Sequence, residues 1–206
     1  MHIENVHIHL GRSGGPLRAA MVAALFASAA SGPRAAGSVN GSQPAEPVKV
    51  AAPPAIGEYW AGQGGEFAGL VRGRDGAPDY HLILATDPKA IFTKRAIGTY
   101  GTDVTCATSD HDGLANTRAY AAAGSELCRE ILAMEIDGHS DFYLPSRVES
   151  RLLWCNLPEQ FEKEWYLTST QSSSCYAWFQ DFGNGYQDRY GKKFDSRARA
   201  VRRLIL

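Results

Sequence analysis

The sequence predicts one α+β domain over residues 58–206, with its elements in the order β-β-α-α-β-β-β. Three observations support this fold class. Short apolar and aromatic runs bounded by Gly, Pro and Asp lie near both ends of the region, as expected for strands and turns. Two segments with helical spacing and polar N-terminal caps lie between those runs. Residues 31–57 carry neither pattern, so we place the start of the domain after them.

Composition limits the classes of protein to which the chain can belong. Its 206 residues are 44% hydrophobic and 21% charged, which is typical of a folded chain rather than a disordered one. The formal net charge is −1, so no overall charge favours nucleic acid or an anionic membrane surface. No apolar run reaches the roughly 18 residues that a membrane-spanning helix needs. We therefore expect no nucleic-acid partner and no membrane insertion.

The segment before the domain differs from it in pattern. Within residues 1–30, alternating side chains at 6–10 predict a short strand, and the Ala-rich stretch 17–30 predicts an amphipathic helix. Residues 31–57, rich in Pro, Ala and Gly, predict a linker or an extended arm. Because this leading segment has little core of its own, we expect it to order by packing against partners. A secretory signal is the alternative, since two arginines precede the apolar stretch.

The domain begins with a predicted hairpin, which two helices follow. Apolar runs at 67–71 and 80–85 flank an Asp-Gly turn signal. Asn116-Thr117 can cap a helix over residues 118–134. A second helix is predicted to begin at Ser146, because a glutamate three residues later completes a capping box, and to end near the next proline.

Three further strands complete the predicted domain, at residues 165–170, 177–182 and 198–204. A tight turn is predicted at residues 183–185, where the sequence reads Gly-Asn-Gly. The last strand lies in a basic cluster made of Arg189, Lys192, Lys193, Arg197, Arg199, Arg202 and Arg203. In this strand we expect Arg197 and Arg199 to face solvent, and Ala198 and Ala200 to face the core.

Several motifs of the domain occur in the order and at the spacing of a known family. They are DGLANT at 112–117, GHSDFYLPSR at 138–147, WYLTST at 165–170, FGNG at 182–185 and RAVRR at 199–203. In this order they resemble the Lcl C-terminal (DUF1566) domain, which is often found in phage and prophage-encoded proteins. The resemblance covers residues 58–206. It implies a C-type-lectin-like fold of two helices beside small antiparallel sheets, with paired first and last strands and chain ends close together.

The resemblance also implies a class of function, because members of the family occur as adhesins and as phage tail or fibre components. We expect a bacteriophage virion structural protein, a tail-tip, fibre or receptor-binding component whose lectin-like domain recognises a host-surface glycan or protein. Residues 1–57 would attach it to other virion proteins and to sister subunits, as trimers. We expect it in the virion, assembled in the host cytoplasm. Two alternatives stay open: a capsid or tail decoration protein without host binding, and a secreted bacterial adhesin.

Candidate ligand-binding residues gather between residues 172 and 190. Tyr, Ser, Asn and Gln combine large rigid contact area with adaptable hydrogen bonding, as antibody paratopes do. Alternate residues of a strand share a face, so the first three candidates are expected to point the same way. The candidates are Tyr176, Trp178, Gln180, Asn184, Tyr186, Gln187, Asp188 and Tyr190. The alternative places Trp178 and Phe182 in the core and the polar residues in ordinary turns.

We expect no enzyme and no cofactor. The chain contains no GxSxG, HExxH or phosphate-loop motif. It also lacks the close cysteine pair of formylglycine-generating enzymes and the calcium-binding motifs of sugar-binding C-type lectins. Asp110, Asp112 and Asp141 are the side chains that would supply oxygen ligands to calcium. We interpret the LPSR motif at residues 144–147 as architecture, with Arg147 able to pair with a carboxylate.

The cysteines predict neither zinc nor a dense disulfide framework. No CxxC spacing occurs, and no histidine stands at a zinc-finger distance from them. Both free thiols and one or two disulfides are compatible with the four residues, which are Cys106, Cys128, Cys155 and Cys175.

Overall fold

The structure is a computed structural model and describes residues 52–206. This part of the chain is a mixed α+β structure with three α-helices and two sheets, which confirms the predicted class at that level. The strand and helix predicted within residues 1–30, and the linker up to residue 51, lie outside the described residues. Within the described part, no helix combines the length and the apolar character that crossing a bilayer requires.

The first sheet is antiparallel and has the strand order β1-β2-β3-β9. Its strands are β1 (Tyr59–Trp60), β2 (Gly65–Val71), β3 (Tyr80–Ala85) and β9 (Val201–Ile205). β2 and β3 form the predicted hairpin. The last strand pairs with β3, whereas β1 pairs with β2 alone among the described strands. The pairing of first and last strands that the family resemblance implies is therefore wrong.

The second sheet has the strand order β4-β8-β5-β6-β7. Its strands are β4 (Ile91–Arg95), β5 (Trp165–Gln171), β6 (Tyr176–Asp181), β7 (Gln187–Gly191) and β8 (Ser196–Arg199). β5 and β8 run parallel, and the other neighbours run antiparallel. The sequence predicts β5 and β6 but not the two edge strands β4 and β7, because most side chains of these short edge strands are exposed or half-buried.

The predicted strand at 198–204 is divided between the two sheets. β8 ends before Ala200 and β9 begins after it. The buried Ala200 donates its N–H to the carbonyl of Ala90 at 3.1 Å and accepts from the N–H of Ala85 at 3.1 Å. Both backbone polar groups of Ala200 are therefore hydrogen-bonded where the chain passes from one sheet to the other, so this crossing can lie within the core.

The helix predicted at 118–134 is two helices, so that prediction is wrong in length and number. α1 spans Gly113–Ala122 and α2 spans Glu126–Leu132. Gly124 adopts a φ of 101°, in the left-handed region that commonly ends helices. The side chain of Ser125 then caps α2. This Gly-Ser pair is the local signal that the prediction overlooks.

The N-terminal cap of α1 also differs from the prediction. Asp112 is the cap, so Asn116 and Thr117 lie inside the helix and are buried. Asn116 accepts from the N–H of Ser109 at 3.1 Å, and the Thr117 hydroxyl accepts from the N–H of Leu144 at 3.1 Å. Both side chains therefore bind neighbouring loops to α1 instead of capping its N-terminus.

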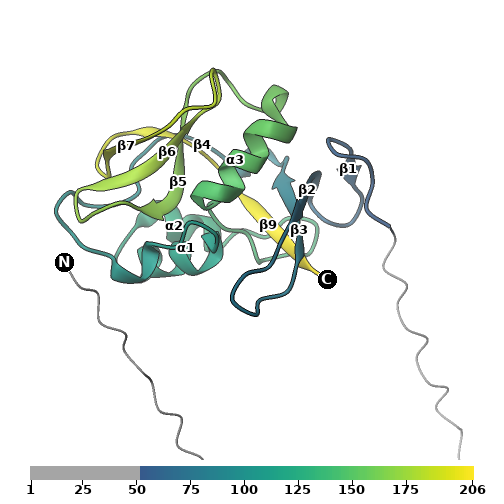
Figure 1. Cartoon of the computed structure of the whole chain (residues 1–206), viewed down its shortest axis with the longest axis horizontal. Helices are drawn as coiled ribbons and strands as arrows, with labels where there is room; N and C mark the ends of the chain where they lie inside the picture. Colours follow the sequence, from purple (N-terminus) through teal and green to yellow (C-terminus); the bar gives the residue numbers. More distant parts are fainter. Residues whose placement is uncertain (1–51) are drawn as a thin grey trace, which may run out of the picture. The chain divides into compact units, whose positions relative to one another are not determined.

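α3 spans Arg147–Asn156 and begins with the predicted capping box, in which Ser146 and Glu149 bond each other's backbone N–H. It lies between the two sheets and contacts β2, β5 and β6 (Figure 1). Three single turns of 3₁₀-helix complete the described elements: η1 (Pro88–Ala90), η2 (Thr105–Ala107) and η3 (Pro158–Gln160).

Two apolar clusters hold these layers together. The first joins α1 and α2 to the second sheet and contains Tyr120 and Phe179. The second joins α3 to the first sheet and contains Leu82 and Leu153. Burial of apolar area contributes about 25 cal/mol per Å², so packing in these clusters stabilises the arrangement of helices and sheets. Phe179 lies on β6, so the first cluster also anchors the strand that carries the candidate residues.

Candidate functional site

The eight candidate residues lie on β6, on the turn after it and on β7, an edge strand of the second sheet. Their exposure varies widely. Tyr176 is 42% exposed and Tyr186 is 71% exposed, whereas Trp178 is half-buried and Gln180 is fully buried. The structure therefore divides the predicted set instead of presenting it as one face.

Gln180 does not belong to the surface, so its prediction as a ligand-binding residue is wrong. It lies on the same face of β6 as Tyr176 and Trp178, but burial increases along the strand until Gln180 is enclosed. Its Nε2 donates to the carbonyls of Asp181 at 2.9 Å and Tyr186 at 3.2 Å. The side chain therefore stabilises the β6–β7 turn.

Trp178 packs against two guanidinium groups. Arg147, the first residue of α3, lies 3.7 Å from the ring centroid, and Arg189, opposite Trp178 in the strand pair, lies 5.6 Å away. Arg147 Nε donates to Gln187 Oε1 at 3.1 Å, and Gln187 Nε2 donates back to the Arg147 carbonyl at 2.8 Å. Arg147 also pairs with Asp110 at 3.5 Å, which confirms the expected carboxylate partner. These contacts fix the orientation of the Trp178 ring.

A polar hollow of about 410 Å³ opens beside Tyr176. Its other lining residues are Ser172 and Ser173, at the β5–β6 turn, and Asp188 and Arg189 of β7. Tyr176 and Asp188 are predicted candidates, and the structure adds the two serines and Arg189. Their nearness in the sequence to the predicted residues is the signal that could have found them. We call Tyr176, Trp178, Gln187 and Asp188, together with Arg147 and Arg189, the β6–β7 surface.

A second exposed tyrosine extends this surface. The ring centroids of Tyr100 and Tyr176 are 6.1 Å apart in an edge-to-face arrangement. The neighbouring Cys175 and Tyr176 side chains raise the pKa of Tyr100 to about 12. Lys193 Nζ lies 5.3 Å from the Tyr100 ring. The sequence does not suggest Tyr100, because only the tertiary structure brings its loop beside β6.

Tyr190 lies on the other face of the sheet from Trp178. It pairs with the buried Ala177, and its ring packs edge-on against Trp165 at 5.0 Å and Phe179 at 5.4 Å. It is still 37% exposed, and Asp188, which pairs with Phe179, faces the same way, whereas Trp178, Gln187 and Arg189 share the other face.

The turn after β6 holds the remaining two candidates. Asn184 Oδ1 accepts from the N–H of Tyr186 at 2.9 Å. Gly185 has a φ of 83°, and a Cβ there would lie 2.4 Å from the Trp154 ring, so only glycine fits. This confirms the predicted tight turn, and Tyr186, which follows Gly185, is exposed.

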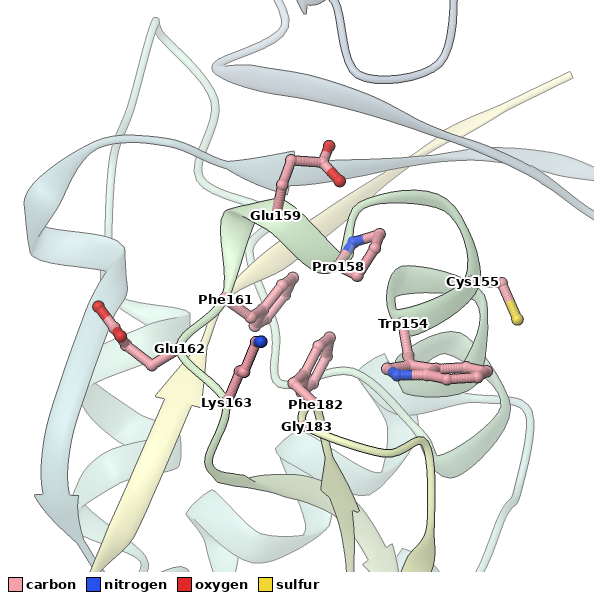
Figure 2. A pocket seen from close by; sticks show the side chains of 9 residues that line it. All are labelled: Trp154, Cys155, Pro158, Glu159, Phe161, Glu162, Lys163, Phe182 and Gly183. Atoms are coloured by element: carbon pink, nitrogen blue, oxygen red, sulfur yellow. The ribbon is translucent and has the colours of Figure 1, made fainter.

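A larger hollow of about 930 Å³ lies at the C-terminal end of α3 (Figure 2). The Phe161 and Phe182 rings stack there with centroids 3.7 Å apart, and Trp154 completes the apolar lining. Both phenylalanines also pack on the buried Tyr166. This hollow is where the second apolar cluster reaches the surface, and it contains none of the candidate residues.

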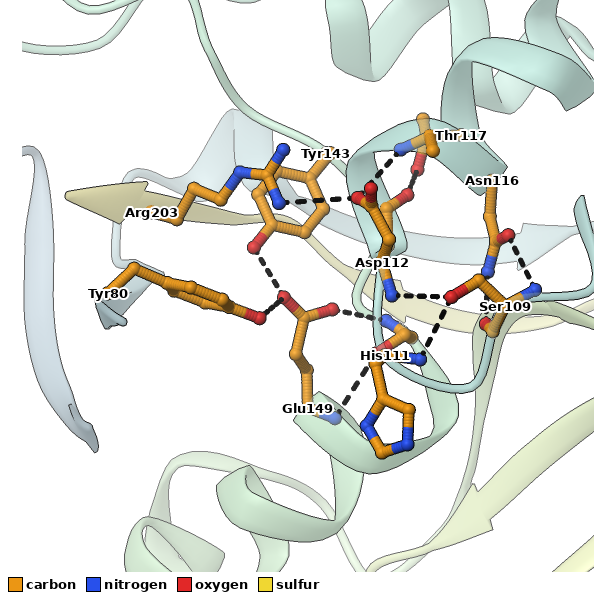
Figure 3. Close-up of polar contacts among 12 residues, drawn as sticks. Tyr80, Ser109, His111, Asp112, Asn116, Thr117, Tyr143, Glu149 and Arg203 are labelled. Atoms are coloured by element: carbon orange, nitrogen blue, oxygen red, sulfur yellow. Dashed lines mark hydrogen bonds and ion pairs between the residues drawn. The ribbon is translucent and has the colours of Figure 1, made fainter. Parts of the chain in front are cut away.

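A buried carboxylate joins α3 to the first sheet (Figure 3). Glu149 accepts from the hydroxyls of Tyr80 at 2.7 Å and Tyr143 at 2.5 Å, and from the N–H of Ser146 at 2.7 Å. Burial, and then the adjacent carboxylate, raise the pKa of both tyrosines above their ordinary value of 10.0. Both hydroxyls therefore stay protonated as donors. We call these four residues the Glu149 cluster.

The three aspartates considered for calcium are each paired with a different arginine. The pairs are Asp110–Arg147 at 3.5 Å, Asp112–Arg203 at 3.2 Å and Asp141–Arg202 at 2.8 Å. Across residues 52–206, no group of three or more His, Cys, Asp or Glu side chains is placed to hold a metal ion. These carboxylates therefore act as partners of arginine in the described structure.

The C-terminal basic residues do not form one exposed patch. Lys192, Arg199 and Arg202 are buried. The Arg199 guanidinium donates to two backbone carbonyls at 2.7 and 2.9 Å, so the prediction that it faces solvent is wrong. Ala198 and Ala200 are buried, as predicted. Several of these cations therefore fasten strands and loops instead of attracting a polyanion.

All four cysteines lie in the described residues and are free thiols. Cys128 is buried, which raises the pKa of its thiol to about 12, whereas Cys106 and Cys155 are exposed. The structure therefore decides the alternative that the sequence leaves open in favour of thiols.

No protein-family model matches the chain, and no curated protein matches it.

Proposed function

We propose that the chain is a bacteriophage virion protein, a tail-tip, fibre or receptor-binding component that attaches to a host-surface ligand through the β6–β7 surface. The observation that carries this proposal is the exposed Tyr176 beside Asp188 and Arg189, which form no ion pair within residues 52–206. An aromatic ring next to unpaired charged groups favours recognition over a purely structural role. The motifs that resemble the DUF1566 domain support the phage context.

The proposal includes a C-type-lectin-like fold for residues 58–206. Three helices and two sheets are compatible with it, and both ends of the domain, β1 and β9, belong to the first sheet. Residues 1–57 are proposed to attach the domain to other virion proteins and to sister subunits, with trimers as the expected assembly. In this arrangement the domain is displayed outward from the particle.

Binding of the purified full-length protein to a panel of bacterial strains tests the proposal. We expect the protein to bind at least one strain and to compete there with phage adsorption. The double variant Tyr176→Ala/Arg189→Ala is expected to lose about tenfold or more in affinity, as residues central to an interface do. The matched control is Tyr59→Ala, an exposed tyrosine on β1 of the first sheet, which should bind normally.

Two results would favour the alternatives. Protein that assembles into particles but neither binds cells nor competes with phage would support a decoration role. A mature chain found by mass spectrometry to lack its N-terminal segment, in a bacterial culture without phage, would support a secreted adhesin.

A further inference from the structure

Three arginines form a row that leads from β7 along α3. Arg147 and Arg189 lie beside the same ring, that of Trp178, with their guanidinium carbons 3.7 and 5.6 Å from its centroid. Arg151 follows Arg147 by four residues, so it lies one turn further along the same side of the helix. Its guanidinium carbon lies 5.6 Å from the centroid of the Trp154 ring. We call Arg147, Arg151 and Arg189 the arginine row.

The arginine row carries an excess of positive charge. Across residues 52–206, Arg147 pairs with Asp110, whereas Arg151 and Arg189 form no ion pair. Asp188 does not face the row, because successive side chains of a strand leave opposite faces and Arg189 is the one that shares a face with the arginine row. A guanidinium group binds a carboxylate through two parallel hydrogen bonds, so the row favours a partner that bears carboxylates.

An apolar hollow lies at the other end of α3 from Arg147 (Figure 2). Trp154, beside which Arg151 lies, lines this hollow of about 930 Å³. The stacked rings of Phe161 and Phe182 line it as well. Its volume lies at the upper end of the roughly 300–1,000 Å³ that is usual for binding pockets, and its aromatic lining favours an apolar group.

The charges around the hollow differ from those of the arginine row. Two carboxylates, Glu159 and Glu162, and one ammonium group, Lys163, line the hollow. Acidic groups of a partner are therefore attracted along the row and repelled at the hollow. The two ends together favour a partner that is apolar at the hollow and acidic along α3.

One extended protein segment can occupy both ends. Trp154 follows Arg147 by seven residues, a rise of about 10 Å along the helix. Three or four residues of an extended chain span this distance, at about 3.3 Å each. Such a segment can place an aromatic or aliphatic side chain in the hollow and the carboxylates of Asp or Glu on the arginines.

We propose that α3 and β7 bind an acidic segment of a host-surface protein, which places one apolar side chain in the hollow and carboxylates on Arg151 and Arg189. This inference rests on the proposed function and deepens it, because it names the class of host ligand. It also extends the site from the β6–β7 surface along α3 to the hollow at its C-terminal end.

Selection from a random dodecapeptide library displayed on yeast tests the inference without host cells. The full-length protein is the target. We expect the selected peptides to be enriched in Asp and Glu on one side of an aromatic or aliphatic residue. Binding of the synthetic peptides, measured by fluorescence anisotropy, should weaken about tenfold when their Asp and Glu are replaced by Asn and Gln. It should also weaken with added salt.

A change in the arginine row tests the acidic end of the segment. Arg151→Gln/Arg189→Gln removes the two guanidinium groups without an ion pair and should weaken peptide binding about tenfold or more. The matched control is Arg74→Gln/Arg118→Gln, which removes two exposed arginines on the β2–β3 turn and on α1. This control should bind the peptides as the wild type does.

A change at the hollow tests the apolar end. Cys155 lines the hollow from an exposed position, so Cys155→Trp should occupy part of it without disturbing the core. We expect peptide binding to weaken about tenfold. The matched control is Cys106→Trp, at an exposed position of η2, which should leave binding unchanged.

Three results of the peptide experiment would overturn the inference. They are a selection that yields no binding peptide, a selection that yields peptides without acidic residues, and peptide binding that stays normal in either the arginine variant or Cys155→Trp.

A measurement on cells tests the host protein as the source of the segment. With a strain that binds the full-length protein, protease treatment of the cells should abolish binding, and periodate, which cleaves vicinal diols of sugars, should leave it intact. The reverse result would overturn the assignment to a protein. If the peptides bind as expected but no strain binds the protein, the peptide site is upheld and the proposed host attachment fails, so the two failures are distinguishable.

Discussion

The Glu149 cluster and the β6–β7 surface contain similar side chains, but these are buried in the first region and exposed in the second. In the Glu149 cluster, a carboxylate and two tyrosines are buried, and each of the hydrogen bonds is internal. On the β6–β7 surface, the carboxylate of Asp188 and the ring of Tyr176 are exposed, and residues 52–206 leave one Asp188 oxygen without a hydrogen bond. The two regions contain the same types of residue. They differ in how deeply these residues are buried and in which groups they contact.

This difference shows why a motif that carries a resemblance to a family need not mark a candidate ligand site. The LPSR motif at residues 144–147 lies beside Glu149, and its serine caps α3. Removing a buried partner leaves other polar groups without one, so such motifs change stability first. Among the candidate ligand residues, Tyr176 and Asp188 are exposed and have few partners within residues 52–206, so their replacement should change binding first. Four predictions sharpen this comparison, in order of decreasing expected effect.

Glu149→Ala should have the largest effect on stability, because it leaves the donors of Tyr80, Tyr143 and Ser146 buried without an acceptor. Each such group costs about 1–3 kcal/mol, so we expect the free energy of unfolding to fall by about 3–5 kcal/mol. Urea denaturation followed by tryptophan fluorescence measures the change. The control Glu126→Ala, at an exposed position in α2, should change it by less than about 0.5 kcal/mol. A loss below about 1 kcal/mol in Glu149→Ala would contradict the role of the cluster.

Alkaline pH should destabilise the same cluster. The pKa values of Tyr80 and Tyr143 are raised in the folded state, so unfolded tyrosines lose their protons first as the pH rises. Stability is therefore complete below about pH 10 and falls above it by about 1.4 kcal/mol per pH unit for each such tyrosine. Denaturation curves at increasing pH measure this slope, and Tyr80→Phe should make it shallower. The slope should persist in the control Tyr186→Phe, whose hydroxyl is exposed.

Arg147 lies beside both regions, so Arg147→Ala should have an intermediate effect on stability. It removes the guanidinium from the Trp178 ring and the reciprocal bonds with Gln187, which together should lower the free energy of unfolding by about 1–2 kcal/mol. Greater exposure of Trp178 should also shift its fluorescence to longer wavelength. Arg118→Ala, at an exposed position of α1, is the control and should show neither change. An unshifted emission spectrum in Arg147→Ala would show that the stack does not position Trp178.

Asp188→Asn and Arg189→Gln should have the smallest effect on stability, within about 0.5 kcal/mol of the wild type, because both residues are exposed and form no ion pair within residues 52–206. Their melting curves are expected to overlay that of the wild type while ligand binding falls. A loss of several kcal/mol would instead mean that these residues support the fold, as Glu149 does.

Prediction and structure agree where the interacting residues are close in the sequence, and they differ where these residues are far apart. The capping box of Ser146 and Glu149, the β2–β3 hairpin and the turn at residues 183–185 depend on close neighbours, and all three are confirmed. The sequence around Gly124 would also have been enough to predict that the single predicted helix is divided there. The burial of several polar residues could not be predicted, because their partners lie far away in the sequence. Lys192, for example, donates to the carbonyl of Thr102 at 2.7 Å.

By itself, the sequence determined the class of fold, most strands and the region in which candidate ligand residues concentrate, because periodicity, caps and turn residues act over a few positions. Only the tertiary structure decided that Gln180 is enclosed, that Arg147 stacks on Trp178, and that a hollow opens beside Tyr176. Burial and electrostatic pairing are set by the neighbours that folding brings together, and no local pattern specifies those neighbours.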